Sequence, residues 1–208
     1  MNNIYPPLHS LWVLSGLTPG LIIGDLWMLF ALYWLVSALN RKKTKRRESI
    51  AQRLLYILPL FVAFFLLFDG AFNGFVRRGW LATHFVPHTA LVQWLGVAIT
   101  VAGMAIACWA RLHLGANWSG VVTLKENHEL IRTGPYRTIR HPIYTGILLA
   151  FVGNVIQLGQ VRGLIALAII GLSFYVKARR EESFLGQEFG PKFNEHTQHT
   201  GMFLPKLS

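Results

Sequence analysis

The sequence predicts an all-α integral membrane protein with about five transmembrane helices, a C-terminal helical hairpin and a final cytosolic helix. Of its 208 residues, 53% are hydrophobic and only 14% are charged, whereas soluble globular chains carry about 25% charged residues. The mean hydropathy is +0.41. Several apolar runs approach the length of about 20 residues that a helix needs to cross the hydrocarbon core. Together these observations exclude an ordinary soluble domain.

The apolar runs and the turns between them define the predicted elements. Pro59 lies inside the second run and predicts a kink, because proline removes a backbone donor. The last two runs are short and are joined by a turn at residues 159–162, which predicts a helical hairpin. Residues 1–20 contain aromatic residues, prolines and glycines, and we expect an interfacial approach segment there. The predicted spans are residues 21–39, 50–68, 90–110, 143–158 and 163–176.

The basic residues predict how the chain is oriented in the membrane. If the N-terminus lies outside, 17 of the 20 Lys and Arg residues fall on the inner side, and only Arg77, Arg78 and Arg162 lie outside. Inner loops of membrane proteins are enriched in Lys and Arg. The net charge of +11 therefore requires no nucleic-acid partner. For the basic cluster at residues 41–47 we prefer a solvated helix flank, with an anionic-lipid site as the alternative.

The composition changes near Arg111, where apolar sequence gives way to a polar inner segment. We therefore predict an anchoring part with three spans, residues 1–110, and a part that carries the chemistry, residues 111–208. The single Cys108 excludes an intrachain disulfide and a CxxC motif. The histidines show no spacing typical of metal ligands, so no metal site is predicted.

A first group of functional candidates surrounds the predicted start of a helix at Pro142. Proline is well tolerated in the first turn of a helix, and a helix N-terminus attracts anions. Arg137 and Arg140 add positive charge beside it. The alternative is that His141 is an ordinary interfacial histidine. Likewise, Tyr136 and Tyr144 taken alone fit the aromatic belt of a membrane protein.

A second group lies where the last span leaves the membrane. Lys177 and Glu181 are four residues apart and share one helix face. Glu182 places a second carboxylate beside Glu181, which is costly at a membrane boundary unless the charges are paired. Spacing alone favours pairing with Arg179 and Arg180 over a positively charged ligand. Gly190-Pro191 predicts the end of this helix.

Taken together, the two groups resemble a known family. The pattern Gly134-Pro135-Tyr136-Arg137-x-x-Arg140-His141-Pro142-x-Tyr144-x-Gly146, followed by Glu181-Glu182-x-x-Leu185-x-x-x-Phe189-Gly190, resembles the isoprenylcysteine carboxyl methyltransferase family and related membrane phospholipid methyltransferases. The resemblance covers residues 111–208. It implies an integral membrane enzyme without a Rossmann fold that uses S-adenosylmethionine (SAM) at the cytosolic face.

The resemblance also implies roles for particular residues. Lys177 and Arg140 are the implied catalytic residues. Lys177 stands where the family usually has an arginine assigned to substrate, and lysine lacks the bidentate fork that grips a carboxylate. SAM carries a carboxylate that suits His141 and the helix start, an ammonium that suits Glu181, and a sulfonium that aromatic faces attract. The implied cofactor-binding residues are His128, Glu129, Leu130, Ile131, Tyr136, His141, Pro142, Ile143, Tyr144 and Glu181.

The methyl acceptor stays open at this point. We expect a lipophilic or small acceptor with a carboxylate or thiol group. A lipid-like acceptor would enter the site sideways from the membrane lipids. One alternative is an amine headgroup, as in phospholipid N-methylation. A sterol-reductase-like enzyme that uses NADPH and a non-catalytic membrane scaffold are alternatives of other classes.

Overall fold

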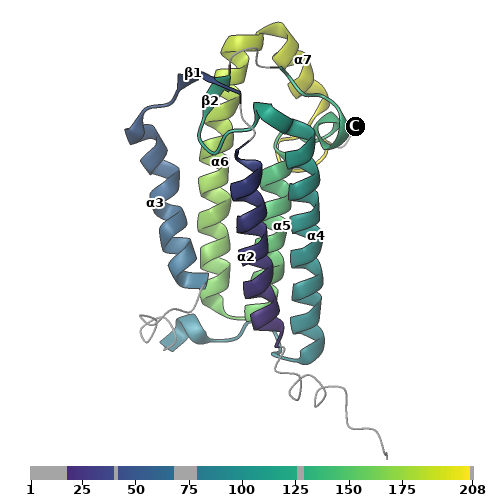
Figure 1. Cartoon of the computed structure of the whole chain (residues 1–208). Helices are drawn as coiled ribbons and strands as arrows, with labels where there is room; N and C mark the ends of the chain where they lie inside the picture. The colour runs from purple at the N-terminus through teal and green to yellow at the C-terminus, as the bar shows by residue number, and fades with distance from the viewer. Residues whose placement is uncertain (1–17, 40–41, 68–78, 126–128, 207–208) are drawn as a thin grey trace, which may run out of the picture.

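The computed structural model describes residues 18–39, 42–67, 79–125 and 129–206, and it is a bundle of long helices (Figure 1). Short 3-10 turns and one two-stranded ribbon connect them. The helices are α2 (Pro19–Ser37), α3 (Ile50–Leu67), α4 (Ala90–Leu114), α5 (Pro142–Leu158), α6 (Val161–Phe189) and α7 (Pro191–His199). The shorter elements are η1 (Gly79–Ala82), η2 (Gly115–Asn117), η3 (Gly134–Arg137), β1 (Thr44–Arg47) and β2 (Thr123–Lys125).

The predicted all-helical, multi-pass membrane fold is confirmed. Within the described ranges, four helices are long and apolar enough to cross a membrane, namely α2, α3, α4 and α6, and α5 is a shorter apolar helix of 17 residues. Most of the predicted interfacial segment at residues 1–20 lies outside the described residues. Pro19 and Gly20 already belong to α2, because the Thr18 hydroxyl caps the helix by accepting from the Leu21 N–H at 3.3 Å.

Helices α4 and α5 pack with almost no space between their backbones. A Cβ atom on Gly103 would lie 2.3 Å from the Ala150 nitrogen, and one on Gly146 would lie 2.5 Å from the Ala107 nitrogen. Glycine and alanine at these positions let the two helices approach, as is typical of helix pairs in membranes. The Thr100 hydroxyl strengthens the contact by donating to the Ala150 carbonyl at 3.2 Å.

The predicted hairpin between α5 and α6 is present, but its turn is shorter than expected. Gly159 adopts a left-handed conformation (φ 68°) and ends α5, and α6 begins at Val161. Arg162 therefore lies inside α6. Its side chain is buried and donates to Gln160 Oε1 at 2.6 Å and to the Leu66 carbonyl at 3.1 Å. These bonds tie the hairpin to the end of α3.

Helix α6 is a single helix of 29 residues, so the last span and the predicted cytosolic helix are continuous. It ends at Phe189, and Gly190 follows with a φ of 50°. The predicted helix end at Gly190-Pro191 is thus confirmed, and Pro191 begins α7, which the sequence did not predict.

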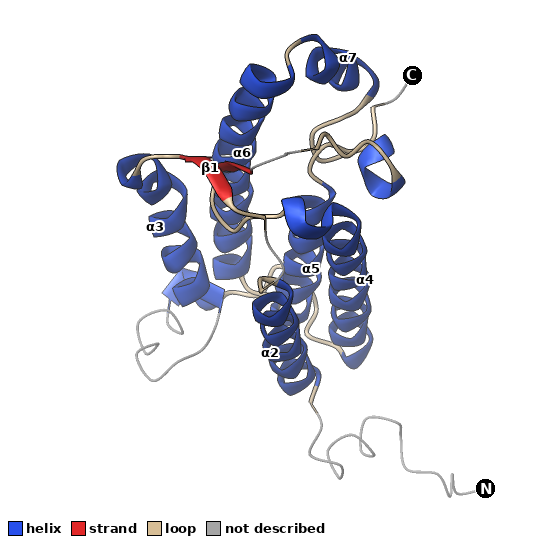
Figure 2. Ribbon diagram, turned by 45° about the horizontal axis from the view of Figure 1, so that its top comes forward, coloured by secondary structure: helices blue, strands red, loops and turns tan. Residues whose placement is uncertain are grey.

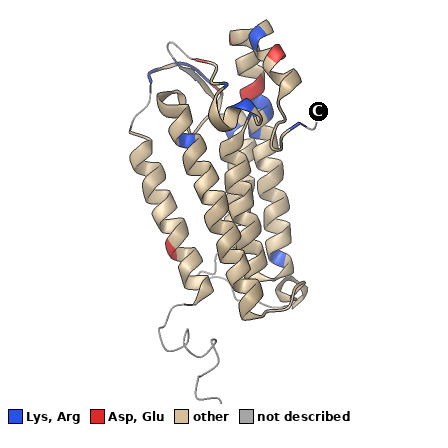
Figure 3. Ribbon diagram, turned by 90° about the vertical axis from the view of Figure 1, so that its right-hand side faces the viewer, with Lys and Arg blue, Asp and Glu red and all other residues tan. Residues whose placement is uncertain are grey.

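The apolar surface and the charged surface lie in different parts of the molecule. Met28, Leu29 and Leu35 of α2 are exposed, as expected for side chains that face lipid. Lys and Arg gather mostly at the end of the bundle where α6 passes into α7 (Figure 3). This distribution follows the predicted orientation, although which side of the membrane it faces remains a prediction.

A two-stranded ribbon of β1 and β2 lies at the charged end of the bundle. β1 pairs antiparallel with β2, and the ribbon lies between α3 and α6 (Figure 2). Lys45 of β1 donates to Glu188 of α6 at 2.9 Å, and Arg46 donates to Gln187 at 2.8 Å. The ribbon therefore joins the first part of the chain to the helix that carries the second group of candidates.

Candidate active site

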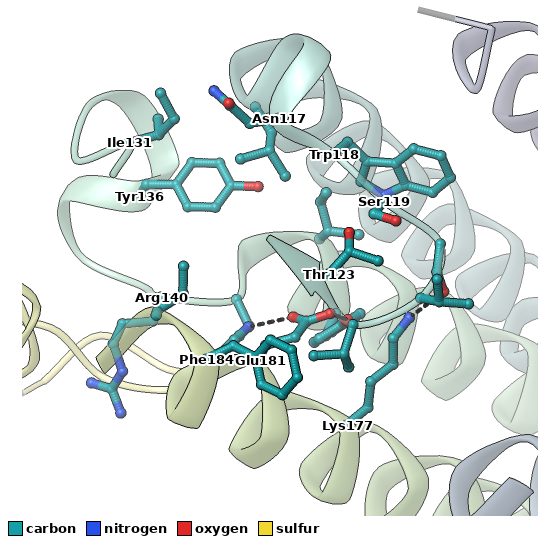
Figure 4. Close-up of a pocket in the computed structure, with 18 of the residues that line it drawn as sticks. Asn117, Trp118, Ser119, Thr123, Ile131, Tyr136, Arg140, Lys177, Glu181 and Phe184 are labelled. Carbon is teal, nitrogen blue, oxygen red and sulfur yellow. Dashed lines mark hydrogen bonds and ion pairs between the residues drawn. The ribbon is translucent and has the colours of Figure 1, made fainter. Parts of the chain in front are cut away.

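A cavity of about 230 Å³ opens at the charged end of the bundle. Its walls come from the start of α5, the cytosolic half of α6 by our predicted orientation, and the chain between η2 and β2. Figure 4 shows Lys177 and Glu181 reaching into it from α6, with Trp118, Ser119 and Thr123 on the facing segment. The two candidate groups are far apart in sequence, since Glu182 follows His141 by 41 positions. They line one space because α5 and α6 form a hairpin.

His141 joins the two candidate groups electrostatically. Its Nε2 lies 3.2 Å from Glu182 Oε1, and its Nδ1 lies 3.5 Å from Glu181 Oε2. Both partners are acceptors, so the imidazole satisfies them only when both of its nitrogens carry a proton. Burial lowers the pKa of His141, but hydrogen bonds and charge from Glu181 and Glu182 outweigh burial and raise it overall. His141 is therefore an imidazolium bridge rather than a free anion site.

Arg140 completes the pairing of Glu182. Its Nε donates to Glu182 Oε1 at 2.7 Å, and its Nη1 donates to the Thr200 carbonyl. Arg179 lies 3.5 Å from the other oxygen of Glu182. The Glu182 carboxylate at the membrane boundary is thus paired with positive charges. The sequence favoured Arg179 and Arg180 as partners, whereas the structure gives Arg140, His141 and Arg179.

Glu181 has a different set of neighbours and remains partly accessible from the cavity. The Tyr144 hydroxyl donates to Glu181 Oε1 at 2.7 Å. The Lys177 Nζ lies 5.3 Å from the centre of the Tyr144 ring and donates to the Gly120 carbonyl at 2.9 Å. Glu181 is 23% exposed against 8% for Glu182. Of the two carboxylates, Glu181 is the one that a ligand can reach.

The C-terminal segment holds the start of α5 in place. The backbone N–H of Arg140 donates to the Gly201 carbonyl at 2.9 Å, and that of His141 donates to the Met202 carbonyl at 3.1 Å. The Thr145 hydroxyl donates to the Phe203 carbonyl at 2.7 Å. These bonds fix the backbone on which His141 and Tyr144 are carried.

The remaining predicted residues occupy different places. Leu130, Ile131 and Ile143 line the cavity, while Pro142 is buried beside it. Glu129 lies at its edge, exposed, and pairs with Lys42 at 3.3 Å. His128 lies outside the described residues.

Tyr136 lines the cavity from η3 and is buried. Its hydroxyl donates to the Ala110 carbonyl at 3.4 Å. Burial, with the charge of Glu181, raises the pKa of Tyr136, so the phenol is neutral. Figure 4 shows the Tyr136 side chain extending from η3 toward the space among the labelled residues, with its hydroxyl at the inner end.

Sequence reasoning missed several residues of the cavity. Asn117 and Thr123 lie on the facing segment, and their Oδ1 and Oγ1 atoms are buried with no hydrogen-bond partner among the described residues. Trp34 and Phe174 contribute apolar surface from α2 and α6. The Asn-Trp-Ser sequence after the third span was the available signal for this wall, because polar residues followed directly on an apolar run.

A larger, apolar cavity of about 540 Å³ lies next to the first. Helices α2, α3, α5 and α6 line it, mostly with aromatic and aliphatic side chains such as Phe30 and Phe64. Trp34, Ile147 and Phe174 line both cavities. The charged space and the apolar space are therefore neighbours that share one wall.

Comparisons with known proteins match this part of the chain. Residues 91–192 match the family model described as phospholipid methyltransferase. A probable protein-S-isoprenylcysteine O-methyltransferase of Oryza sativa subsp. indica is 31% identical over 116 residues, which cover 53% of this chain and 61% of that protein. The second half of the chain is thus similar to membrane phospholipid and isoprenylcysteine methyltransferases.

Other similar proteins carry different names. The cobalt-zinc-cadmium resistance protein CzcN of Cupriavidus metallidurans is 30% identical over 139 residues, covering 64% of this chain and 57% of that protein. A solved structure of the eukaryotic intramembrane Ras methyltransferase ICMT is similar with a TM-score of 0.48 and 23% identity, covering 76% of this chain and 53% of that chain. The chain thus spans less than two thirds of the length of these relatives.

Proposed function

We propose that this protein is a SAM-dependent membrane methyltransferase that methylates a lipophilic acceptor at the cytosolic membrane face. The observation that carries the proposal is the junction of the two cavities. One has the charged and polar groups of Glu181, Lys177 and Tyr144 on its wall, and the other is apolar and lies among the membrane helices. A water-soluble donor and a lipid-like acceptor fit these two spaces.

The residues present fit SAM. Glu181 offers a partly exposed carboxylate for an ammonium group, and the faces of Tyr136 and Tyr144 attract cations. Asn117 Oδ1 and Thr123 Oγ1 have no partner among the described residues, and a polar ligand would satisfy the amide oxygen as acceptor and the hydroxyl as donor or acceptor. We assign cofactor binding to these residues together with Ile143, Leu130 and Ile131, and we assign His141 to the same site as the residue that holds Glu181 in place. When bound, SAM supplies a methyl group on a positively charged sulfur, which a nucleophile can take directly.

The protein's own contribution is alignment and exclusion of water. Such alignment of two reactants replaces a costly encounter by a preorganised geometry. Lys177 is the cation best placed to orient an anionic acceptor, because Arg140 is held by Glu182 and Thr200. The shared wall of Trp34, Ile147 and Phe174 keeps the junction apolar. A carboxylate or thiolate acceptor needs no general base at this site.

A phospholipid amine headgroup is the second candidate acceptor. The description of the matching family model favours it. An amine acceptor must lose a proton, which requires a base, and Glu181 is the carboxylate that the cavity exposes. With an amine acceptor, Glu181 would therefore act as the base. With a carboxylate or thiolate acceptor, it would only bind the ammonium group of SAM.

Transfer of a labelled methyl group tests the proposal. Purified protein in lipid nanodiscs receives labelled SAM with N-acetyl-S-farnesylcysteine, an alkyl thiol or phosphatidylethanolamine as acceptor. We expect one lipophilic acceptor to be labelled by the wild type. We expect a loss of at least about a hundredfold in kcat/KM for Glu181→Gln, because the hydrogen bond from Tyr144, the ion pair with His141 and a charge are changed together. Glu188→Gln, which alters an exposed pair with Lys45, is the matched control.

Each result decides between the alternatives. Labelled phosphatidylethanolamine would select the amine headgroup, and labelled farnesylcysteine the carboxylate. No transfer to any acceptor, together with no binding of SAM, would overturn the proposal. Activity of Glu181→Gln equal to that of Glu188→Gln would remove Glu181 from the site.

A further inference from the structure

Lys177 lies between two tyrosines, and each tyrosine is hydrogen-bonded to a glutamate. Its Nζ is 5.3 Å from the ring centre of Tyr144 and 5.6 Å from that of Tyr56. The Tyr144 hydroxyl donates to Glu181, and the Tyr56 hydroxyl donates to Glu48. The second pair comes from the first part of the chain, for which the sequence predicted only an anchoring role.

Glu48 is buried more deeply than its position suggests. It follows β1 directly and precedes α3, yet it is only 6% exposed. Its Oε1 accepts from the Tyr56 hydroxyl and from the Val122 N–H at 3.1 Å, and its own N–H donates to the Val122 carbonyl at 3.1 Å. Glu48 thus connects α3 with the segment that forms the wall opposite α6.

The second oxygen of Glu48 has no hydrogen-bond partner among the described residues. A buried carboxylate is costly unless a positive charge compensates it. The negative charge of Glu48, like that of Glu181, acts on the Lys177 ammonium. Lys177 is also held by the Gly120 carbonyl, two residues before Val122. Glu48 therefore influences Lys177 both through its charge and through the backbone segment that it fixes.

We propose that Glu48 and Tyr56 form a positioning pair that holds the Lys177 ammonium at the junction of the two cavities. The role of Lys177 toward an acceptor rests on the proposed function, whereas its placement by Glu48 does not. With this pair, residues from both parts of the chain, 1–110 and 111–208, form the acceptor end of the site. Glu48 and Tyr56 act through Lys177 and touch neither reactant.

Chemical labelling of Lys177 tests the placement without any assay of activity. The wild type and Glu48→Gln are treated with acetic anhydride at one pH, and acetylation of Lys177 is followed by mass spectrometry. Only the neutral amine reacts, and a nearby carboxylate favours the charged form. We expect Lys177 to react measurably faster in Glu48→Gln, because loss of a negative charge near the ammonium lowers its proton affinity.

The control for labelling is Glu188→Gln, which removes the carboxylate beside Lys45. It is expected to leave Lys177 unchanged. An equal rate of Lys177 acetylation in the wild type and in Glu48→Gln would overturn the proposal, whether or not the protein transfers methyl groups. If Glu48→Gln does not fold, Tyr56→Phe replaces it in the measurement of kcat/KM described next. This variant removes only the hydroxyl that holds Glu48.

A double-mutant cycle with Lys177 separates positioning from general stability. With N-acetyl-S-farnesylcysteine as acceptor, Glu48→Gln is expected to lower kcat/KM for the acceptor about tenfold and to leave the Kd for SAM unchanged, in line with couplings between contacting residues. In a Lys177→Ala background the same change is expected to have no further effect. An equal loss in both backgrounds would show a purely structural role and overturn the inference. Absence of transfer by the wild type would instead count against the proposed function, and the labelling result would then decide the placement of Lys177.

Discussion

The Tyr144 hydroxyl donates a hydrogen bond of 2.7 Å to Glu181 Oε1, and this contact joins the start of one membrane helix to the end of the next. Tyr144 lies in the first turn of α5 and Glu181 lies in the last third of α6. The contact orients the one carboxylate of the adjacent pair that the cavity exposes. It follows that ligand binding and the geometry of the helical hairpin are linked.

Loss of the Tyr144 hydroxyl is expected to weaken SAM binding without unfolding the protein. Tyr144→Phe keeps the ring between His141 and Phe174 but frees Glu181 to rotate. A hydrogen bond to a charged group contributes about 1.5–3 kcal/mol, so we expect the Kd for SAM to rise by about tenfold or more. Titration calorimetry measures this. A Kd equal to that of the wild type would show that Glu181 needs no orientation.

Removal of Glu182 is expected to destabilise the protein more than removal of Glu181. Glu182→Ala leaves the partly buried Arg140 and the buried His141 without their shared partner. Breaking one side of a buried ion pair costs about 3–5 kcal/mol. Thermal denaturation in detergent compares the two alanine variants. A smaller loss of Tm for Glu182→Ala than for Glu181→Ala would contradict the pairing described for this cluster.

The imidazolium of His141 predicts a dependence of stability on pH. The pKa of His141 is raised in the folded protein, so its contribution is complete below the unfolded value of about 6.5. The contribution is lost as the pH rises through the raised value. We therefore expect the Tm to fall above neutral pH, and His141→Gln to flatten this fall.

His196 serves as a control of opposite sign. Burial, together with Arg132 and Arg140, lowers the pKa of His196. Its contribution is present above about pH 6.5 and is lost as the pH falls through the lowered value. His196→Gln should thus change the acidic part of the profile and leave the alkaline part intact. A flattened alkaline part in His196→Gln would contradict the assignment to His141.

The glycines between α4 and α5 make a prediction about folding alone. A Cβ at Gly103 would lie 2.3 Å from a backbone atom of α5, whereas one at Gly171 of α6 meets nothing within 4 Å. Overpacking of a tight contact costs about 1–3 kcal/mol. Gly103→Ala is expected to lower the Tm clearly, and Gly171→Ala to leave it unchanged or raise it. Equal Tm values for the two variants would show that the helices separate easily.

The parts of the fold that the sequence predicted depend on local patterns. Hydropathy located every long helix, because crossing a membrane needs an unbroken apolar run. Gly159 and Gly190 marked the helix ends in the sequence, and both have a positive φ in the structure. His141 and Glu181 were brought together by the hairpin, whose two helices run back along each other. Here the order of motifs along the chain was sufficient.

The parts that were missed depend on contacts between distant segments. Glu48 follows the basic cluster at residues 41–47 and was not singled out from the sequence, because only the pairing of β1 with β2 places it against Val122. The C-terminal segment around Gly201 has no periodic pattern, yet its carbonyls hold the backbone of Arg140 and His141. Such long-range hydrogen bonds leave no signal in a single sequence.

Equilibrium binding of SAM tests the central claim most directly. Calorimetry on the purified protein in nanodiscs compares SAM with NADPH, for the wild type, Glu181→Gln and the control Glu188→Gln. We expect SAM to bind the wild type and Glu188→Gln equally and Glu181→Gln at least about tenfold more weakly, because a charged hydrogen-bond partner is lost. We expect no binding of NADPH. Binding of NADPH in place of SAM, or of neither, would contradict the account.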